Sequence, residues 1–394
     1  MEHRTAQILF ALLRSVFCGT KADKEEISLT PETLSELLSI SRKHDIEHLL
    51  VYGLELNGLI PEEYGEITNR IFEAAYRCEQ LCFEYEKMCS VLEEEKIPFI
   101  PLKGAVVRKH YPEAWMRTSC DIDILVHEEN LEKSVSALID KCEYTYYKKG
   151  SHDVALITPS KIRVELHYSL IENEISKASS AVLSQVWDSA NIRQGFSYQY
   201  EMSEEMFYFY HIAHMAKHFE NGGCGIKPFA DLWFINGIDG ATPQKREALL
   251  AQGNLLTFAE MAQKLSKVWF DDEDADSISL QMESFVLSGG SFGSSKNRIA
   301  VQQQKKGGKI GYLFTKIFLP YNEIKFIYPV LQKHRWLTPI MEVFRWLKLI
   351  FGSRSKSVAK EIKQNQSVSA EESEAARRFL LSIGLLSDNL HGKE

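Results

Sequence analysis

Apolar residues recur at every third or fourth position through most of the first 96 residues, which is the pattern of amphipathic helices. This spacing predicts four helices, over 4–18, 32–42, 45–57 and 61–96. Thr30 and Pro31 stand before the second of them in the order expected for a cap followed by the first helical turn. The last and longest of these helices, over 61–96, is expected to be a packing element without chemistry of its own.

The period changes between residues 97 and 170, where apolar and polar residues alternate in short runs. The alternation predicts five strands, over 99–102, 121–126, 144–148, 154–158 and 163–168. Helical patterns at 104–110 and 131–141 separate the first three strands, and turn residues at 150–151 and 159–160 separate the last three. This order predicts a small mixed sheet with one face covered by helices.

Helical periodicity returns after the predicted sheet, with helices expected over 177–187, 203–219, 229–236, 245–252 and 255–268. A glycine- and serine-rich break follows at 289–295, and the polar stretch 356–370 is predicted to be disordered before a short helix at 371–383. We therefore expect an α+β fold with a small mixed sheet surrounded by N-terminal and C-terminal helical regions. The expected regions are 1–96, 97–172, 173–290 and 291–394.

The composition is typical of a soluble globular protein, and the net charge argues against one class of partner, nucleic acid. Of the 394 residues 44% are apolar and 25% are charged, and the net charge of −8 argues against a dedicated nucleic-acid-binding protein. No run of apolar residues is long enough to predict a transmembrane segment, and the N-terminus resembles an amphipathic helix rather than a signal peptide. The seven cysteines are scattered without a CxxC pair. We expect reduced thiols and a cytoplasmic location.

The charge is unevenly distributed. Residues 300–352 contain nine Lys or Arg against two Glu, a balance of +7 that leaves the remainder of the chain near −15. Within this stretch, the aromatic-rich segment 309–352 has two interpretations: a surface that touches anionic membrane or an acidic partner, or a helical cap on the body with solvated lysines. Prolines at 320, 329 and 339 argue against one long membrane-lying helix, and the cap is favoured.

The strongest chemical signal is the pair Asp121 and Asp123 on the second predicted strand. Strand side chains alternate, so the two carboxylates point to the same side, where they repel each other unless a cation lies between them. Such a pair suits a Mg²⁺ site on phosphate substrates. Taken alone the signal is weak, because paired acidic residues at sheet ends are often solvated or capping.

Flanking residues strengthen the interpretation. Lys103 and Gly104 lie at a strand-to-helix junction upstream, where glycine allows close backbone approach and lysine adds a positive charge suited to polyphosphate. Downstream, Glu165 alternates with Arg163 and His167 along a predicted strand. If that strand neighbours the Asp121 strand, Glu165 becomes a third carboxylate of the same site.

The pattern PLKG…YPEAWMRTSCDIDILV…VELHYSL resembles the DNA polymerase β type of nucleotidyltransferase, and more narrowly a bacterial family of uncharacterised nucleotidyltransferases. The stretch HIAHMAKHF…GIKPFADLWFI is similar to the second half of that family. Lys103-Gly104 departs from the Gly-Gly or Gly-Ser of the wider superfamily, which puts the usual glycine–serine phosphate contact in doubt.

The resemblance implies that Asp121, Asp123 and Glu165 are catalytic and hold Mg²⁺ or Mn²⁺, with Glu165 completing a second metal position. It also implies that Lys103 and Gly104 bind the triphosphate of an NTP, with ATP expected. Arg117 has two open alternatives, contact with the same phosphates or an ion pair with Asp121.

Histidines near these motifs are less specific. His167 shares the face of Glu165 and could orient a phosphate or the acceptor, although a structural histidine at a strand end is the preferred interpretation. His211, His214 and His218 form one helical stripe, but without an HExxH pattern they do not predict a zinc site. We expect the stripe to pack against the sheet. Lys217, Lys227 and Asp231 could line the nucleotide or acceptor side of the cleft, although a structural role is the preferred interpretation for each.

Together these signals predict a metal-dependent nucleotidyltransferase that moves an NMP group from an NTP to a hydroxyl of a small molecule or protein and releases pyrophosphate. The helices after the sheet would form the acceptor side. A metal-dependent phosphohydrolase and a non-catalytic nucleotide-binding or interaction module remain alternatives. The acceptor has no sequence signature.

Overall fold

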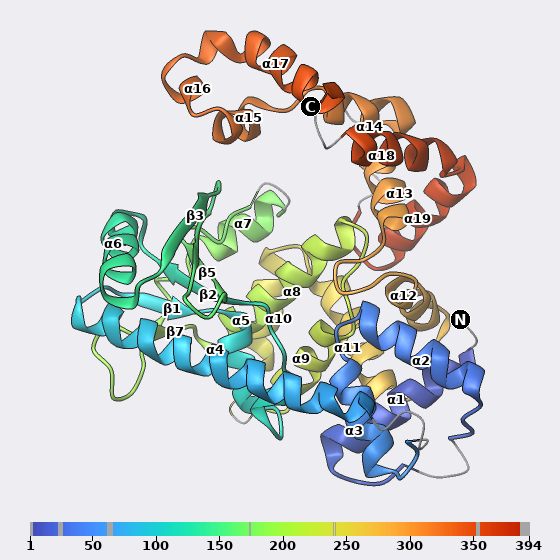
Figure 1. Ribbon diagram of the computed structural model, residues 1–394. Helices are drawn as coiled ribbons and strands as arrows, with labels where there is room; N and C mark the ends of the chain where they lie inside the picture. The colour runs from blue at the N-terminus through green and yellow to red at the C-terminus, as the bar shows by residue number, and fades with distance from the viewer. Residues whose placement is uncertain are drawn as a thin grey trace.

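The computed structural model describes residues 3–22, 27–60, 66–172, 175–238, 240, 242–351 and 355–386. It has the expected α+β architecture, with one small mixed sheet set among helices that precede and follow it (Figure 1). Within the described residues, no helix combines the length and apolar character needed to cross a membrane.

The N-terminal helices follow the predicted periodicity closely. They are α1 (His3–Cys18), α2 (Pro31–Lys43), α3 (Glu47–Leu56) and the long α4 (Asn69–Glu94). The Thr30 hydroxyl accepts a hydrogen bond from the Thr33 amide at 3.2 Å, which confirms the predicted cap of α2. The predicted start of the long helix at Pro61 lies outside the described residues.

The sheet contains five strands in the order β1-β2-β5-β4-β3. Their bounds are β1 (Phe99–Pro101), β2 (Asp121–Val126), β3 (Thr145–Lys149), β4 (Asp153–Ile157) and β5 (Arg163–His167). The central pair β2 and β5 is parallel, whereas β1, β4 and β3 join by antiparallel pairing. The predicted mixed sheet is therefore confirmed.

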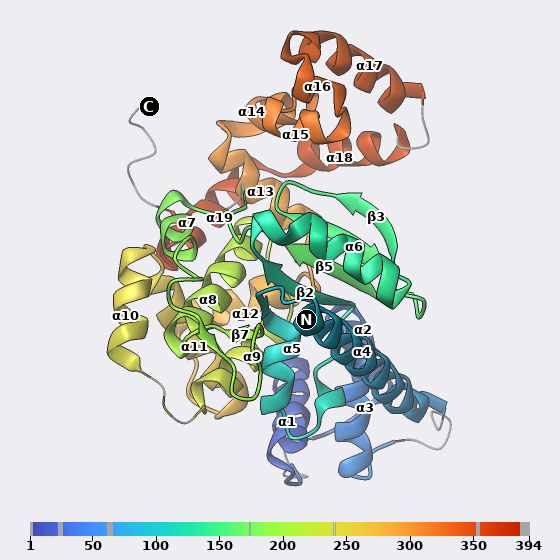
Figure 2. The ribbon, with the colours of Figure 1, turned by 90° about the vertical axis from the view of Figure 1, so that its left-hand side faces the viewer.

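Helices cover one face of this sheet. Ile122 and Ile124 of β2 and Val164 of β5 pack into a buried cluster with Met88 of α4 and Leu138 of α6 (Leu131–Cys142). Figure 2 shows α6 and α4 beside the sheet from this side. Because strand side chains alternate, the polar residues of β2 and β5 face away from this cluster.

The helices after the sheet share a core with the N-terminal helices. They are α7 (Lys177–Leu183), α8 (Glu204–Glu220), α9 (Lys227–Asn236), α10 (Pro243–Gln252), α11 (Leu256–Phe270) and α12 (Ser277–Leu287). A short antiparallel pair, β6 (Asn191–Ile192) and β7 (Tyr200–Glu201), precedes α8. Phe10 of α1 stacks on Trp269 of α11 with ring centroids 4.3 Å apart, so residues 259 positions apart in the chain share one core.

The C-terminal part is helical, and its residues 308–351 project from the body (Figures 1 and 2), whereas Val301 and Phe379 belong to the core of the body. It contains α13 (Ser295–Lys305), α14 (Gly308–Ile317), α15 (Tyr321–Ile327), α16 (Val330–Lys333), α17 (Thr338–Phe351), α18 (Ser355–Ser367) and α19 (Ala370–Ser382). The expectation of disorder over 356–370 is wrong for the described residues. Polar side chains of α18 bind neighbouring helices: the Tyr312 hydroxyl donates to Glu361 at 2.6 Å, and Gln303 donates to Asn365 at 2.8 Å. The final residues of the predicted tail, 387–394, lie outside the described residues.

Candidate active site

Asp123 and Glu165 lie directly opposite each other on the parallel strands β2 and β5, and Asp121 lies opposite Arg163. The same register buries Ile122 and Val164 on the opposite face. Glu165 therefore lies beside Asp123, as expected if the two predicted strands are neighbours. The catalytic roles of these carboxylates stay predictions.

His167 joins the two carboxylates. Its Nε2 atom lies 3.2 Å from Oδ1 of Asp123 and 3.7 Å from Oε2 of Glu165. Ligand atoms of Asp123, Glu165 and His167 all lie within 4.8 Å of one another, close enough to surround one metal ion. Two carboxylates and an imidazole are donors that a divalent cation such as Mn²⁺ accepts, so this side-chain set fits a metal. A structural role is the preferred interpretation of His167 from the sequence. In the structure its ring lies beside Asp123 and Glu165 and forms one cluster with them.

The pKa values within this group are pulled in opposite directions. Burial alone would raise the pKa of Asp123, but the hydrogen bond and charge of His167, with the charge of Lys103, lower it below its ordinary value. Burial would lower the pKa of His167, and Asp123 raises it instead. The pKa of Glu165 is raised by burial and by the negative charge of Asp123. His167 and Asp123 therefore shift each other's pKa in opposite directions.

Asp121 lies at the edge of this group. The Ser119 hydroxyl lies 2.6 Å from the Asp121 carbonyl oxygen and 3.3 Å from its carboxylate Oδ1. Burial and the neighbouring charge of Asp123 raise the pKa of Asp121, while Lys103 opposes this rise. Asp121 is therefore a partly desolvated carboxylate that lies close enough to Asp123 to feel its charge.

Lys103 and Gly104 begin the short helix α5 (Lys103–Val107), directly after β1. Lys103 has φ of 26°, a strained value for a residue with a side chain. Its Nζ lies 5.5 Å from the ring centroid of Tyr210 in α8. Burial lowers the pKa of Lys103, and the charges of Asp123 and Asp121 oppose that shift. The ammonium group thus lies near both carboxylates.

Gly104 is not required by the backbone, because its φ lies outside the left-handed region. A Cβ built at this position would have only Ser119 as a close neighbour, at 3.5 Å, which is ordinary contact distance. Neither backbone conformation nor packing therefore explains a glycine here. Its small size leaves room beside Ser119 and Asp121 for a ligand to approach the chain.

Helix α8 contributes the other charged groups near Lys103. Lys217 of α8 forms an ion pair with Glu172, and His152 Nε2 lies 3.6 Å from the same Glu172 carboxylate. His214 and His218 contact each other through their Nε2 atoms at 3.2 Å. Burial lowers the pKa of His218 to about 4, with a further contribution from the charge of Lys103. His214 and His218 therefore lie near Lys103, at the start of α5, and the packing of the stripe against the sheet stays a prediction.

His211 and Lys227 have structural partners. His211 Nε2 lies 2.9 Å from the carbonyl oxygen of Pro228, and Lys227 forms an ion pair with Asp45. The described residues that can surround one metal are Asp123, Glu165 and His167, and the α8 stripe is not among them. A zinc site on the stripe was not expected.

Arg117 takes a partner that neither alternative foresaw. Its Nε and Nη2 atoms donate to the two carboxylate oxygens of Asp231 at 2.6 and 2.7 Å, and the Tyr111 hydroxyl donates to the same carboxylate at 2.7 Å. Asp231 is buried, and the side chain of Arg117 is 12% exposed. The ion pair with Asp121 is therefore not formed. The guanidinium instead connects the loop before β2 to α9 through its two hydrogen bonds to Asp231.

Three contributors near the site were not singled out from the sequence: Ser119, Glu172 and Tyr210. Tyr210 lies within a regular helical pattern, and Glu172 follows β5 in a segment without periodicity, so neither has a local signal. Ser119 stands two residues before Asp121, and a hydroxyl so close to a predicted metal ligand is the one signal that could have been used.

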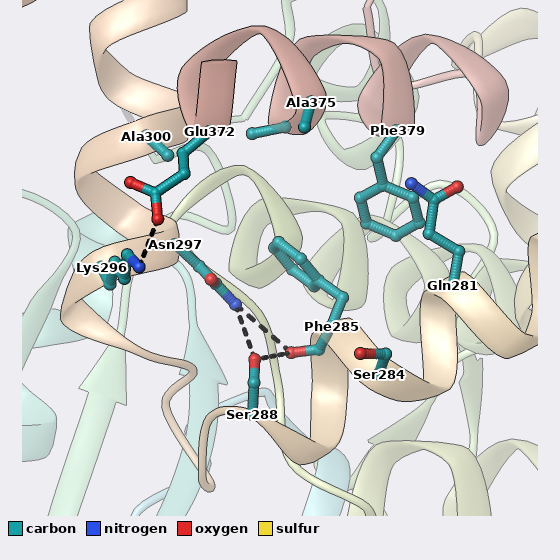
Figure 3. A pocket seen from close by; sticks show the side chains of 11 residues that line it. Gln281, Ser284, Phe285, Ser288, Lys296, Asn297, Ala300, Glu372, Ala375 and Phe379 are labelled. Atoms are coloured by element: carbon teal, nitrogen blue, oxygen red, sulfur yellow. Dashed lines mark hydrogen bonds and ion pairs between the residues drawn. The ribbon is translucent and has the colours of Figure 1, made fainter. Parts of the chain in front are cut away.

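A separate hollow of about 400 Å³ lies between α12, α13 and α19 (Figure 3). Phe285 and Phe379 form its apolar side, and Lys296 pairs with Glu372 across its other end at 2.5 Å. None of these helices contributes to the acidic group on β2 and β5. The hollow is therefore distinct from the candidate active site.

Comparison with protein families gives one match. The family model described as uncharacterised nucleotidyltransferase matches residues 30–271, which include the whole sheet, the acidic group and helix α8. No curated protein and no solved structure matches the chain significantly.

Proposed function

Because this chain belongs to the uncharacterised nucleotidyltransferase family, we propose that it transfers an NMP group from an NTP to a hydroxyl group with release of pyrophosphate. Family membership supports nucleotidyl transfer in general. The proposal adds metal dependence, ATP as the expected NTP, and a small molecule or protein as acceptor. The observation that carries it is the grouping of Asp123, Glu165 and His167 beside Lys103.

Asp123 and Glu165, with Asp121 beside them, are the residues proposed to hold Mg²⁺ or Mn²⁺. A divalent cation bound there would neutralise the polyphosphate and the charge that develops on the leaving oxygen. The donor set supports this, since carboxylate oxygens are the ligands that these ions prefer. His167 hydrogen-bonds Asp123 and so holds one carboxylate oxygen in a defined direction.

Lys103, Gly104 and Lys217 are proposed to bind the phosphates. Lys103 lies close enough to Asp121 and Asp123 to alter their pKa values, so a phosphate beside the carboxylates would lie within its reach. Gly104 leaves the start of α5 unobstructed. Lys217 forms an ion pair with Glu172 and is the second ammonium group near Lys103. Arg117 is proposed to position the β2 loop through Asp231.

The transfer step requires a base and alignment. The acceptor hydroxyl oxygen forms a bond to the α-phosphorus, the bond to the bridging oxygen breaks, and pyrophosphate leaves with that oxygen. A carboxylate oxygen of Glu165 is proposed to accept the hydroxyl proton, because the raised pKa of Glu165 makes it the more basic member of the pair. Binding both substrates next to this carboxylate supplies most of the remaining rate enhancement.

The proposal is tested with the full chain, an NTP radiolabelled at the α-phosphate, Mg²⁺ or Mn²⁺, and a cell extract as the source of acceptor. We expect the label to move to an acceptor as pyrophosphate appears. Asp121→Ala/Asp123→Ala should abolish both signals, whereas Asp140→Ala on the exposed side of α6 should retain them. Label transfer that survives in the double variant would refute the assignment.

The two alternatives give different results in the same experiment. A phosphohydrolase would release phosphate without labelling any acceptor. A non-catalytic module would be stabilised against heat by Mg²⁺ and a non-hydrolysable NTP but would form neither product. Absence of that thermal stabilisation would contradict nucleotide binding at the site.

A further inference from the structure

Helices α14–α17, residues 308–351, form a C-terminal lobe that leaves much of its apolar surface uncovered. Eleven of the 23 large hydrophobic side chains exposed in the described residues lie between Ile310 and Leu347. The favoured interpretation of this segment was a cap on the body, but the lobe projects from the body beyond α13 and α18 (Figures 1 and 2). We propose that the C-terminal lobe docks the protein on an anionic lipid surface.

Helix α17 is oriented with its apolar face outward. Ile340, Val343, Phe344 and Leu347 recur at helical spacing, so they form one stripe, and all four are exposed. A helix that belongs to a globular core buries such a stripe. Within the described chain Phe344 meets the ring of Tyr328 edge-on, with centroids 6.3 Å apart, but all four side chains of the stripe stay exposed.

Polar contacts on the opposite face of α17 hold the helix in this orientation. Glu342 and Arg345 are buried, with exposed fractions of 7% and 8%, and they pair with each other at 2.7 Å. Glu342 accepts a hydrogen bond from the Leu319 amide at 2.8 Å, and Arg345 donates to the Ile317 carbonyl oxygen at 2.5 Å. These bonds hold the charged side of α17 against α14 and leave the hydrophobic side for another surface.

Helix α14 and its C-terminal end extend the uncovered apolar area. Ile310, Phe314 and Ile317 are exposed at helical spacing. Phe318 stacks on Phe314 with centroids 5.6 Å apart and contacts Trp346 of α17 edge-on at 5.2 Å. Trp336, between α16 and α17, is 72% exposed. Exposed tryptophan and phenylalanine are the side chains that insert at the level of lipid headgroups.

Charge identifies the lipid as the expected occupant. Residues 300–352 carry +7, whereas the remaining chain carries −15. Lys306, Lys309, Lys333, Arg335 and Lys348 are exposed among the apolar residues. Interleaved cations and large apolar groups match an anionic bilayer surface, where the apolar groups enter the interface and the cations meet headgroups. Projection of the lobe keeps the acidic body away from that surface, and repulsion is screened over about 8 Å at physiological salt.

The test uses sedimentation of the full chain with vesicles of phosphatidylcholine alone or of phosphatidylcholine mixed with phosphatidylserine. We expect binding to the mixed vesicles only, weakened by added salt. Val343→Glu/Leu347→Glu should reduce the bound fraction by about tenfold. The matched control is Phe72→Glu/Phe83→Glu, which makes the same change at two exposed positions of α4 and should bind as the unaltered chain does.

Three outcomes would overturn the proposal. The first is absence of binding to mixed vesicles, and the second is equal loss in both double variants. The third is a dimer in lipid-free solution that Val343→Glu/Leu347→Glu dissociates while vesicles capture neither form, because the apolar face would then be an interface between copies. Since both lobe substitutions lie on exposed positions, circular dichroism should show the same helical content in every variant.

Discussion

Asp123 and Glu165 face each other across the only parallel pair in the described five-stranded sheet, 42 residues apart in the chain. Parallel pairing brings both carboxylates to the same face because the register is in phase at this position. Both are partly buried, and the charge of Asp123 raises the pKa of Glu165. This repulsion is the electrostatic cost that a bound cation would remove.

Glu165→Gln tests that cost directly. The amide keeps the shape of the side chain but removes one of two like charges, so we expect an unchanged or higher Tm. Nucleotidyl transfer should fall by at least about 10²-fold, since both a metal ligand and the proposed base are lost. The measurement is a thermal melt beside a labelled-nucleotide assay. A transfer rate equal to that of the unaltered chain would remove Glu165 from the mechanism.

Gly104→Ala separates ligand clearance from folding. The added Cβ meets only Ser119 at ordinary contact distance, and alanine favours a helix by about 0.5–1 kcal/mol over glycine. We therefore expect equal or greater stability together with weaker NTP binding, by about tenfold or more. Titration calorimetry with a non-hydrolysable NTP and a urea melt provide the two values. The control is Gly237→Ala at the end of α9, where the nearest atoms lie 3.6 Å or farther away. A destabilised Gly104→Ala chain with normal affinity would contradict the role of Gly104.

Local periodicity accounts for much of what could be predicted. Alternation in DIDILV and RVELH placed Asp121, Asp123 and Glu165 on one side of their strands, and a short-range hydroxyl contact at Thr30 marked the start of α2. Both signals depend on neighbours within a few residues. The pairing of β2 with β5 followed only if the two strands were adjacent, and the structure supplies that adjacency.

Features that depend on distant partners could not be predicted. Arg117 and Asp231 are 114 residues apart, and nothing near either residue identifies the other. Likewise, the amphipathic pattern of α17 defines an apolar stripe but not the direction in which it points. The polar composition of α18 suggested disorder because its stabilising partners, Gln303 and Tyr312, lie in other helices.

Arg117→Gln should act on stability more than on nucleotide binding. The variant leaves the buried Asp231 carboxylate without its bidentate partner, and breaking a buried ion pair costs about 3–5 kcal/mol. Arg42→Gln is the matched control, because the more exposed Arg42 pairs with Glu47 at 2.7 Å and such pairs contribute about 1 kcal/mol or less. Urea denaturation gives both values. Normal stability of Arg117→Gln with a raised KM for NTP would instead place Arg117 among the phosphate ligands.

Lys217 and Glu172 allow a two-sided test of the phosphate assignment. Lys217→Met removes the ammonium group and should raise KM for the NTP by about tenfold with a smaller change in kcat, as expected for a ground-state contact. Glu172→Gln removes the carboxylate that pairs with Lys217 and should leave KM unchanged or lower it. Steady-state kinetics over a range of NTP concentrations distinguish the two. Equal increases in KM for both variants would indicate that the ion pair acts only through structure.

Stability should decline in mild acid because His48 is buried as a neutral imidazole. Burial lowers its pKa to about 4; its Nε2 lies 3.1 Å from the Met116 carbonyl oxygen, and the charges of Lys227, Asp45 and Arg117 act on it in opposing senses. As the pH falls through about 6.5, the unfolded chain binds a proton that the folded chain excludes until about pH 4. The contribution of neutral His48 to the free energy of unfolding is therefore fully present above about pH 6.5. It is lost between that value and pH 4, with a slope of about 1.4 kcal/mol per pH unit. His48→Gln should reduce the slope by that amount in urea melts at several pH values, while His334→Gln at an exposed position should not. Parallel pH profiles for all three chains would show that His48 does not couple protonation to folding.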